Sequence, residues 1–358
     1  MLDIFITFLI SFLLSFSFIL AFSKLFYKLD IVDNPEKYGK KRKPIPYSMW
    51  VIFFLVFFLV SYFFVDHNYK LYLLWFFGGI ITTISFIDDR LDVSAKIRLI
   101  VQIIIGAVIW VTSIKIGYIS NVFGWIINLE TYYFEIFNHT IYIIPLIFTI
   151  LWYVFIFNAL NWTDWIQGNT SGLGIISFLV LFLLGYILFL KDDYEWWIKN
   201  AKFIMQLSII LVWILIPFFY FDVKEKILMW DSWTMFLGFM LASLAIIAWG
   251  KIATVLVVFG IYSVDAIYVI LRRLYNKKNP LSWDFTHLHH RLLDIWLDKS
   301  QVLSVIFVLS FFFWITALFL DKTWKIIVFV IIIFVVIFIN EIVKILSKKF
   351  KNKKWQID

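Results

Sequence analysis

The sequence predicts an all-α fold, a polytopic bundle of about eleven membrane-spanning helices in one domain that covers residues 1–358. Hydrophobic residues make up 63% of the chain, and the mean hydropathy is +0.92. Charged residues make up only 16%, against about 25% in a typical soluble domain. Apolar runs alternate with short polar segments along the whole chain, which is the pattern of a protein that crosses the membrane many times.

A membrane-spanning helix needs a run of about 17–25 predominantly apolar residues. Eleven runs are candidates, at 3–22, 49–65, 71–87, 98–118, 140–157, 172–190, 202–220, 234–249, 252–270, 302–320 and 324–345. No small-residue cleavage site follows the first run, which leads into Ser23 and Lys24. We therefore expect a retained span there rather than a signal peptide.

The distribution of basic residues predicts the orientation. Most of the 32 Lys and Arg residues fall in alternate loops, which the positive-inside rule places in the cytoplasm. The N-terminus is then outside, the C-terminus is cytoplasmic, and the protein is expected in the cell membrane. The basic runs at 40–43 and 348–354 are typical of anchors to anionic membrane lipid, with Lys43 kept as a substrate candidate. No nucleic-acid partner is needed to explain the net charge of +8, and the absence of Cys excludes thiolate metal sites.

Four polar clusters interrupt the apolar sequence, at 88–92, 158–164, 231–232 and 287–290. Ionisable groups beside membrane spans are costly, so these clusters are the candidates for function. All four fall on the predicted cytoplasmic side. The orientation follows from the Lys and Arg residues and not from the clusters. That all four clusters fall on one side therefore supports a single cytoplasmic active site.

The carboxylates of these clusters suit a hard cation. Mg²⁺, with Mn²⁺ as an alternative, takes one or two protein carboxylates and completes its shell with water and substrate phosphates. The sequence therefore predicts metal-assisted phosphoryl chemistry. In the adjacent pair Asp88-Asp89, one carboxylate can bind the metal while the other orients a nucleophile. A solvated helix end is the competing explanation for the pair.

Asn158, Asn161 and Asp164 lie three residues apart, so a helical end would bring them to one face. Gly168, Gly172 and Gly174 follow, which indicates backbone that bends or approaches a ligand. Helix packing is the alternative explanation for Gly172 and Gly174.

Three of the five histidines lie together, at His287, His289 and His290. They follow the basic residues Arg272 and Arg273 in the longest predicted cytoplasmic loop. Imidazole and guanidinium groups can bind a diphosphate or a nucleotide. Zinc is the weaker alternative for the cluster.

In their order along the chain, these segments resemble the signatures of the polyprenyl-phosphate N-acetylhexosamine-1-phosphate transferases. The matching residues are Ile87-Asp88-Asp89-Arg90-Leu91-Asp92 with Lys96 and Gln102, Asn158-Ala159-Leu160-Asn161 with Thr163-Asp164, Asp231-Ser232 before Leu237-Gly238, and Asp284 with His287-Leu288-His289-His290-Arg291-Leu292. The resemblance runs from about residue 24 to residue 293. No single segment is specific, but the ordered set is.

The resemblance implies an Mg²⁺-dependent membrane enzyme that transfers a sugar-1-phosphate from a UDP-N-acetylhexosamine to polyprenyl phosphate and releases UMP. It implies that Asp231 and Asp88 are metal ligands and that Asp88, Asp89 and Asp164 are catalytic. The substrate-binding residues that it implies are Lys43, Asp92, Lys96, Asn158, Asn161, His287, His289, His290 and Arg291. A homodimer and a monomer are equally compatible with the sequence.

The His-x-His-His segment resembles the branch of the family that begins O-antigen, teichoic acid or capsule chains with N-acetylglucosamine phosphate. Thr163-Asp164 is closer to the peptidoglycan branch, which uses a muramoyl-pentapeptide donor. N-acetylglucosamine is therefore the expected sugar, and the muramoyl-pentapeptide donor is the alternative. An ion transporter would place ionisable groups near the bilayer midplane and show repeated halves, which this sequence does not. A lipid transporter stays open as an alternative.

The chain departs from the family pattern at four positions where glycine is expected. Tryptophan stands at 50, 165, 230 and 233, and Gln167 replaces a usual second aspartate. A bulky side chain would block a backbone that needs positive φ or touches a diphosphate. One explanation is a non-catalytic homologue. The other is a genetic code that reads UGA as glycine, which is compatible with 13 Gly and 18 Trp in 358 residues.

Overall fold

The computed structural model describes residues 2–38, 43–47, 49–91, 93–112, 114–120, 126–136, 139–191, 194–248, 256–257, 260–277, 287–295, 297–320 and 322–354. These residues divide into two compact units, Met1–Lys251 and Ile252–Asp358. The sequence predicted one domain over the whole chain, and this stays a prediction.

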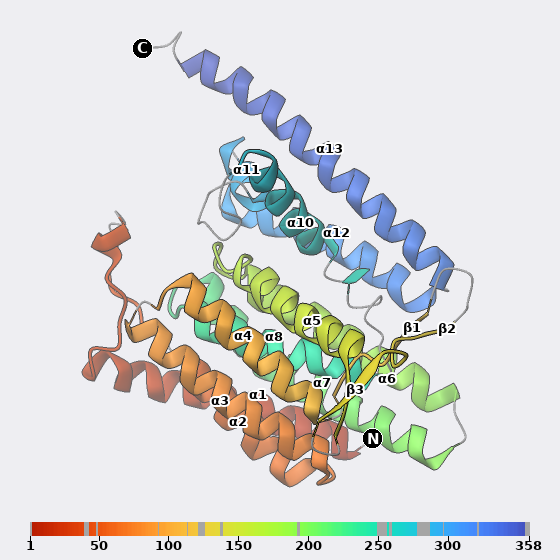
Figure 1. Ribbon diagram of the computed structural model, residues 1–358. Helices are drawn as coiled ribbons and strands as arrows, with labels where there is room; N and C mark the ends of the chain where they lie inside the picture. The colour runs from red at the N-terminus through yellow and green to blue at the C-terminus, as the bar shows by residue number, and fades with distance from the viewer. Residues whose placement is uncertain are drawn as a thin grey trace. The chain divides into compact units, whose positions relative to one another are not determined.

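The first unit is a bundle of long apolar helices (Figure 1). They are α1 (Leu2–Lys28), α2 (Trp50–Phe64), α3 (Tyr69–Leu91), α4 (Ala95–Val111), α5 (Ile143–Asn161), α6 (Asn169–Lys191), α7 (Glu195–Val223) and α8 (Trp230–Ile247), with a short 3-10 helix at Pro35–Tyr38. Helix α8 is central, because it packs against α2, α3, α5, α6 and α7. Buried aromatic rings fill this centre, for example Phe57 and Phe236, whose ring centroids lie 5.8 Å apart.

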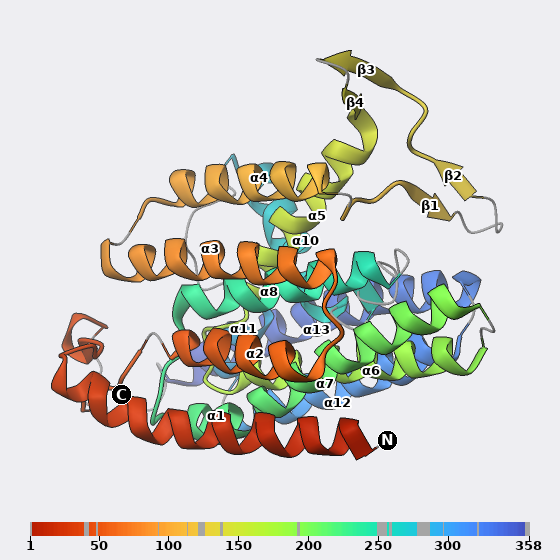
Figure 2. The same cartoon turned by 90° about the horizontal axis from the view of Figure 1, so that it is seen from below.

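Two antiparallel hairpins connect α4 and α5. Strand β1 (Tyr118–Ser120) pairs with β2 (Ile126–Asn128), and β3 (Tyr133–Ile136) pairs with β4 (His139–Tyr142). The hairpins extend beyond the end of α5 in Figure 2. The sequence did not predict these strands, although the protein is otherwise helical as expected.

The second unit contains α10 (Gly260–Tyr275), α11 (Leu288–Asp294), α12 (Lys299–Phe319) and α13 (Lys322–Lys354). Helices α12 and α13 are long and apolar, whereas α10 ends in Arg272 and Arg273. The short helix α11 packs on α12 and α13. It carries His289, His290 and Arg291 on its first turns.

Seven helices in the described part of the chain are long and apolar enough to cross a membrane, and α2 and part of α8 are shorter apolar helices. This agrees with a helical polytopic membrane protein. The number of eleven spans and the orientation of the termini stay predictions. The proposed span at 252–270 falls largely outside the described residues before Gly260.

Three predicted cytoplasmic loops of the first unit meet at one end of the bundle. The backbone of Leu228, before α8, bonds to Pro46, before α2. Gly168, before α6, bonds to Asp222 at the end of α7. The connections after α2 and α6 lie at the other end, where Lys202 of α7 forms an ion pair with Asp66. The fold therefore brings the polar clusters of the first unit to one end, as a common site requires.

Candidate functional site

Asp88 lies at the end of α3, where its carboxylate closes the turn into α4. Its Oδ1 accepts the Val93 N–H at 3.0 Å, and its Oδ2 lies 3.7 Å from the Arg98 guanidinium. The Asp88 side chain is 11% exposed. Asp88 thus has a structural role in the α3–α4 turn, which the prediction of a catalytic carboxylate did not include. Lys96, in the same turn, is exposed.

Asn158, near the end of α5, is connected to α4. Its side-chain amide donates to Gln102 Oε1 at 2.7 Å, and the amide of Gln102 donates to the sulfur of Met235 on α8 at 3.5 Å. Asn161, one turn further on, donates instead to Thr234 Oγ1 on α8 at 3.2 Å. The two asparagines therefore hold α5 against two different helices, and they position the polar ends of α4 and α8 near one another.

Asp164 lies in the tight turn that follows α5, where its backbone N–H donates to the Asn161 carbonyl. The turn ends at Gly168, whose φ of 89° confirms the predicted backbone bend. Gly174 instead permits packing, because an added Cβ would lie 3.1 Å from Leu215 on α7. The Asp164 turn is fixed to α7 through the buried carboxylate of Asp222, which accepts the Gly168 N–H at 2.9 Å.

Asp89, beside Asp88, interacts electrostatically with Tyr47 in the segment before α2. Burial raises the pKa of the Tyr47 phenol, and among the nearby charges Arg90 lowers the pKa while Asp89 raises it. This places the segment 43–47 beside the end of α3. Lys43, the predicted substrate-binding residue of that segment, is exposed.

A cavity of about 190 Å³ adjoins these polar groups. Its walls come from α3, α4, α5 and α8, and they are mostly Ile, Val, Phe and Met. Asp88, Arg98 and Gln102 supply its charged and amide groups. Ile87 and Ile97 line it too and are about half exposed, so the cavity opens at the surface between α3 and α4. It therefore combines apolar walls with the charged side chains of Asp88 and Arg98.

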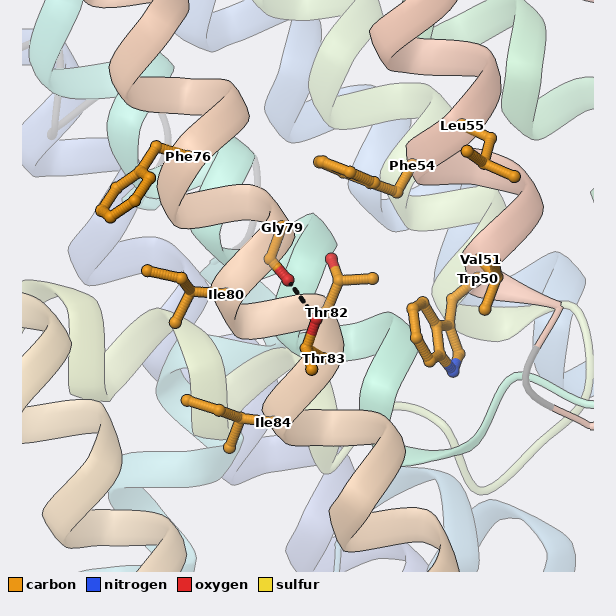
Figure 3. A pocket seen from close by; sticks show the side chains of 10 residues that line it. All are labelled: Trp50, Val51, Phe54, Leu55, Phe76, Gly79, Ile80, Thr82, Thr83 and Ile84. Atoms are coloured by element: carbon orange, nitrogen blue, oxygen red, sulfur yellow. Dashed lines mark hydrogen bonds between the residues drawn. The ribbon is translucent and has the colours of Figure 1, made fainter.

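A larger cavity of about 530 Å³ lies between α2 and α3, and Ile84 lines both cavities (Figure 3). Trp50 of α2 lines it across from Thr82 and Thr83 of α3. Its lining contains no charged side chain among the residues that the structure describes. The smaller cavity is therefore the one that combines an apolar wall with ionic groups.

The backbone has no positive φ at the four departures from the family pattern. Positive φ among the described non-glycine residues occurs at Asp30, Glu225 and Lys277, and at none of these four positions. Trp50 is buried, and its ring packs edge-on against Phe86 with centroids 5.6 Å apart. Its indole N–H has no hydrogen-bond partner among the described residues. Trp165, in the Asp164 turn, is 38% exposed.

Two of the predicted site residues lie wholly or partly outside the described residues. Asp92 lies outside the described residues. Asp231 is in the first turn of α8, and its side chain, like those of Trp230 and Trp233, lies outside them. The backbone position of Asp231 is at the same end of the bundle as Asn161, because the next turn of α8 carries Thr234.

The second unit gathers the three predicted histidines. The rings of His287 and His289 are parallel at 5.8 Å between centroids, and those of His289 and His290 are 4.3 Å apart. Neither ring nitrogen of His289 has a hydrogen-bond partner among the described residues. Burial, and then the charges of His290 and His287, lower the pKa of His289 well below its ordinary value. His289 is therefore a neutral imidazole at physiological pH.

Arg291, predicted to bind substrate, is held by other residues of the second unit. Its guanidinium donates to Asn340 Oδ1 of α13 at 3.0 Å and lies 5.7 Å from the ring centre of Tyr268 on α10. It thus connects α11 with α13 and α10. Its predicted role in substrate binding is not tested by these contacts.

Comparison with known proteins identifies the family. The model of "Glycosyl transferase family 4" matches residues 71–249, half of the chain. The chain belongs to glycosyl transferase family 4. Among its curated relatives is a "Probable undecaprenyl-phosphate N-acetylglucosaminyl 1-phosphate transferase" of Bacillus subtilis, which is 28% identical over 76% of this chain and 73% of the relative.

Two further relatives have similar descriptions. The "Undecaprenyl-phosphate alpha-N-acetylglucosaminyl 1-phosphate transferase" of Salmonella typhi is 26% identical over 79% of this chain and 74% of the relative. The "Decaprenyl-phosphate N-acetylglucosaminephosphotransferase" of Mycolicibacterium smegmatis is 26% identical over 64% of this chain and 58% of the relative. These findings confirm the resemblance to the polyprenyl-phosphate N-acetylhexosamine-1-phosphate transferases, and they identify this chain as a multi-pass membrane member of the family.

Four supporting residues were absent from the predicted set: Arg98, Asp222 and Thr234 in the first unit, and Asp265 in the second unit, whose carboxylate lies 2.8 Å from His287 Nδ1. Asp222 and Asp265 carried a usable signal, because a single acid within or beside an apolar run needs a buried partner. Arg98 and Thr234 carried none, since their partners are recognised only after the helices have packed.

Proposed function

We propose that the protein transfers N-acetylglucosamine-1-phosphate from UDP-N-acetylglucosamine to polyprenyl phosphate at the cytoplasmic face of the cell membrane. The product is a lipid-linked diphosphate sugar that begins a cell-envelope glycan, and the by-product is UMP. The names of the relatives support this sugar over the muramoyl-pentapeptide alternative. Family membership supports a transferase.

The small cavity beside Asp88 is the observation that carries the proposal. An acceptor lipid needs an apolar wall for its first isoprene units and ionic groups at the level of its phosphate. The cavity supplies both, with Arg98 as the cationic group. At about 190 Å³ it is smaller than the roughly 300–1,000 Å³ typical of sites that enclose a whole ligand. It therefore takes only the head end of the chain, and the remaining isoprene units lie in the membrane.

The reaction we propose is a single in-line displacement. A phosphate oxygen of the acceptor lipid forms a bond to the sugar-linked phosphorus of the donor, and the bond from that phosphorus to the bridging oxygen breaks, so that UMP leaves. Asp88 or Asp89 orients the attacking phosphate, and Asp164 lines the same centre. A covalent phospho-aspartate trapped during turnover would overturn this single-step mechanism.

The donor set fits Mg²⁺, with Mn²⁺ as the alternative. The described residues contain no group of three His, Cys, Asp or Glu side chains that could hold a metal ion, so a cage made only of protein ligands is absent from this part of the chain. Mg²⁺ does not need one, because it binds one or two carboxylates and takes its other ligands from water and phosphates. Asp88 and Asp231 are the ligands we propose. When bound, the metal neutralises negative charge on the transferred phosphoryl group.

The histidine cluster of the second unit is the proposed site for the nucleotide-sugar. His287, His289, His290 and Arg291 bind the donor there. Lys43, Lys96, Asn158 and Asn161 are further substrate-binding residues that the family pattern implies in the first unit. Asp92 completes the predicted set. This assignment rests on the family pattern, and it is supported by the clustering of the three imidazole rings.

The experiment measures KM for the acceptor and for the donor in two matched variants. We expect V101W, which fills the small cavity, to raise KM for undecaprenyl phosphate by at least about tenfold and to leave KM for UDP-N-acetylglucosamine unchanged. The control I80W places the same ring in the larger, uncharged cavity and should behave like the unmodified protein. Equal effects of V101W and I80W would contradict the assignment of the acceptor to the small cavity.

The same assay is run on two forms of the chain, one as printed and one with glycine at 50, 165, 230 and 233. Activity in the glycine form alone would show that the tryptophans inactivate the protein, and the codons at these positions would then show whether it naturally carries glycine. No UMP release by either form with any UDP-sugar would contradict the proposed function.

A further inference from the structure

Asp265 on α10 makes two hydrogen bonds to the histidine segment. Its Oδ2 lies 2.8 Å from Nδ1 of the His287 ring, and its Oδ1 accepts the backbone N–H of Leu288 at 3.0 Å. Both oxygens of one carboxylate are therefore directed at two consecutive residues of the chain. The two groups come from segments 22 residues apart in sequence.

The pair is buried. Asp265 is 1% exposed and His287 is 6% exposed. A carboxylate placed among apolar side chains is costly unless it is hydrogen-bonded, so the two bonds explain how Asp265 is tolerated inside α10. The same cost would favour an apolar residue at this position if the only requirement were packing. A polar pair in such a place is therefore a candidate for function.

The hydrogen bond defines the state of the imidazole. A carboxylate only accepts hydrogen bonds, so the ring nitrogen that faces it must carry a proton. Nδ1 of His287 is then the protonated nitrogen, and in the neutral ring Nε2 carries the lone pair. The carboxylate fixes both the orientation of the ring and its tautomer, as acidic partners of catalytic and metal-binding histidines do.

We propose that Asp265 is a positioning residue of the donor site, which holds His287 with Nδ1 protonated so that Nε2 is the nitrogen that interacts with the nucleotide-sugar. This inference rests on the proposed function of the histidine cluster. The role falls to His287 because its partner is a carboxylate, whereas His289 has no hydrogen-bond partner among the described residues and is kept neutral by burial.

A purely structural role for Asp265 makes a different prediction. The bond to Leu288 N–H caps the first turn of α11, and it could be the whole reason for the carboxylate. The D265N variant separates the two roles. Its amide oxygen can still accept from Leu288, but its NH₂ group must face His287 Nδ1, which then becomes the acceptor. The cap is kept, and the tautomer of His287 is reversed.

The first experiment measures the tautomer directly. Protein labelled with ¹⁵N only in histidine has five imidazole rings to resolve, and H287Q identifies the signals of His287. We expect a protonated Nδ1 in the unmodified protein and a protonated Nε2 in D265N. The control S263A changes a buried hydroxyl on the same helix that has no partner among the described residues, and it should leave the His287 signals unchanged. An unchanged tautomer in D265N would overturn the proposal.

The second experiment tests whether Asp265 acts through His287. We expect D265N to lower kcat/KM for UMP release by about 10²–10⁴, between the loss of up to about 100-fold for a changed partner of a metal-binding histidine and the loss of about 10⁴ for the amide replacement in a catalytic triad. H287Q should lose a similar factor, and the double variant D265N/H287Q should be no worse than H287Q alone. Additive losses, or full activity of D265N, would contradict the positioning role.

The two experiments fail independently. If neither the printed chain nor its glycine form releases UMP, the proposed function is wrong, and the ¹⁵N spectra still decide whether Asp265 sets the tautomer of His287. If UMP is released normally by D265N, the proposed function stands and the inference about Asp265 is wrong.

Discussion

Replacement of Asp222 by alanine should loosen the turn that carries Asp164. Asp222 is 2% exposed, and its Oδ2 accepts both the Gly168 N–H at 2.9 Å and the Ser171 hydroxyl at 2.7 Å. In D222A both donors lose their acceptor inside the protein. Each buried, unsatisfied donor costs about 1–3 kcal/mol, so we expect a total loss of roughly 2–6 kcal/mol of stability.

The D222N variant is the control for D222A. Because both hydrogen bonds go to the same oxygen, the amide oxygen of D222N can accept both of them. We expect D222N to lie within about 1 kcal/mol of the unmodified protein, and S171A, which removes one donor, to lose about 1 kcal/mol.

Thermal unfolding followed by intrinsic tryptophan fluorescence, on purified protein in detergent, measures these differences. A loss of 2 kcal/mol or more corresponds to a fall of at least roughly 4 °C in the midpoint for a unit of this size. UMP release should fall in D222A and persist in D222N, because the Asp164 turn is displaced only in the former. Equal midpoints for D222A and the unmodified protein would refute the reasoning, and so would a D222N variant as unstable as D222A.

Three further predictions follow from the described geometry. Burial lowers the pKa of His289, so at and below about pH 6.5 the unfolded chain binds more protons than the folded protein; lowering the pH to 5.5 should therefore destabilise the protein through this residue, and H289F should lack that part of the acid sensitivity in denaturation measurements. G168A should lower the unfolding midpoint, since a Cβ at φ 89° costs about 1–2 kcal/mol, whereas an unchanged midpoint would show that the turn relaxes. N158L should leave the Gln102 side-chain oxygen without its donor and lower the free energy of unfolding by about 1–3 kcal/mol. N158Q should partly restore the hydrogen bond, and the same unfolding assay measures both variants.

The apolar runs predicted the helices well because burial in lipid requires a long uninterrupted stretch of apolar side chains. The first run extends further than predicted, to Lys28, since flanking polar residues continue a helix without any change in periodicity. The hairpins between α4 and α5 were missed because all three residues of β2 are exposed and give no alternation between buried and exposed positions.

The candidate site was predicted in outline but not in its supporting contacts. The bend at Gly168 was visible in the sequence, because positive φ selects glycine. The groups that donate to the carboxylates of Asp222 and Asp265 were not visible, because Gly168 and His287 lie 54 and 22 residues away from them. Likewise, spacing alone suggested one face for Asn158 and Asn161, yet the packing of α5 between α4 and α8 gives them different partners.

The measurement that tests the central claim most directly is the identity of the nucleotide released from UDP-N-acetylglucosamine by purified protein with undecaprenyl phosphate. We predict UMP, formed only when Mg²⁺ or Mn²⁺ is present, together with a lipid that carries both the sugar and its phosphate. D231N and D88N should lower the rate by at least about 10². Release of UDP, or UMP formation that persists in both variants or after removal of the metal with EDTA, would contradict the account.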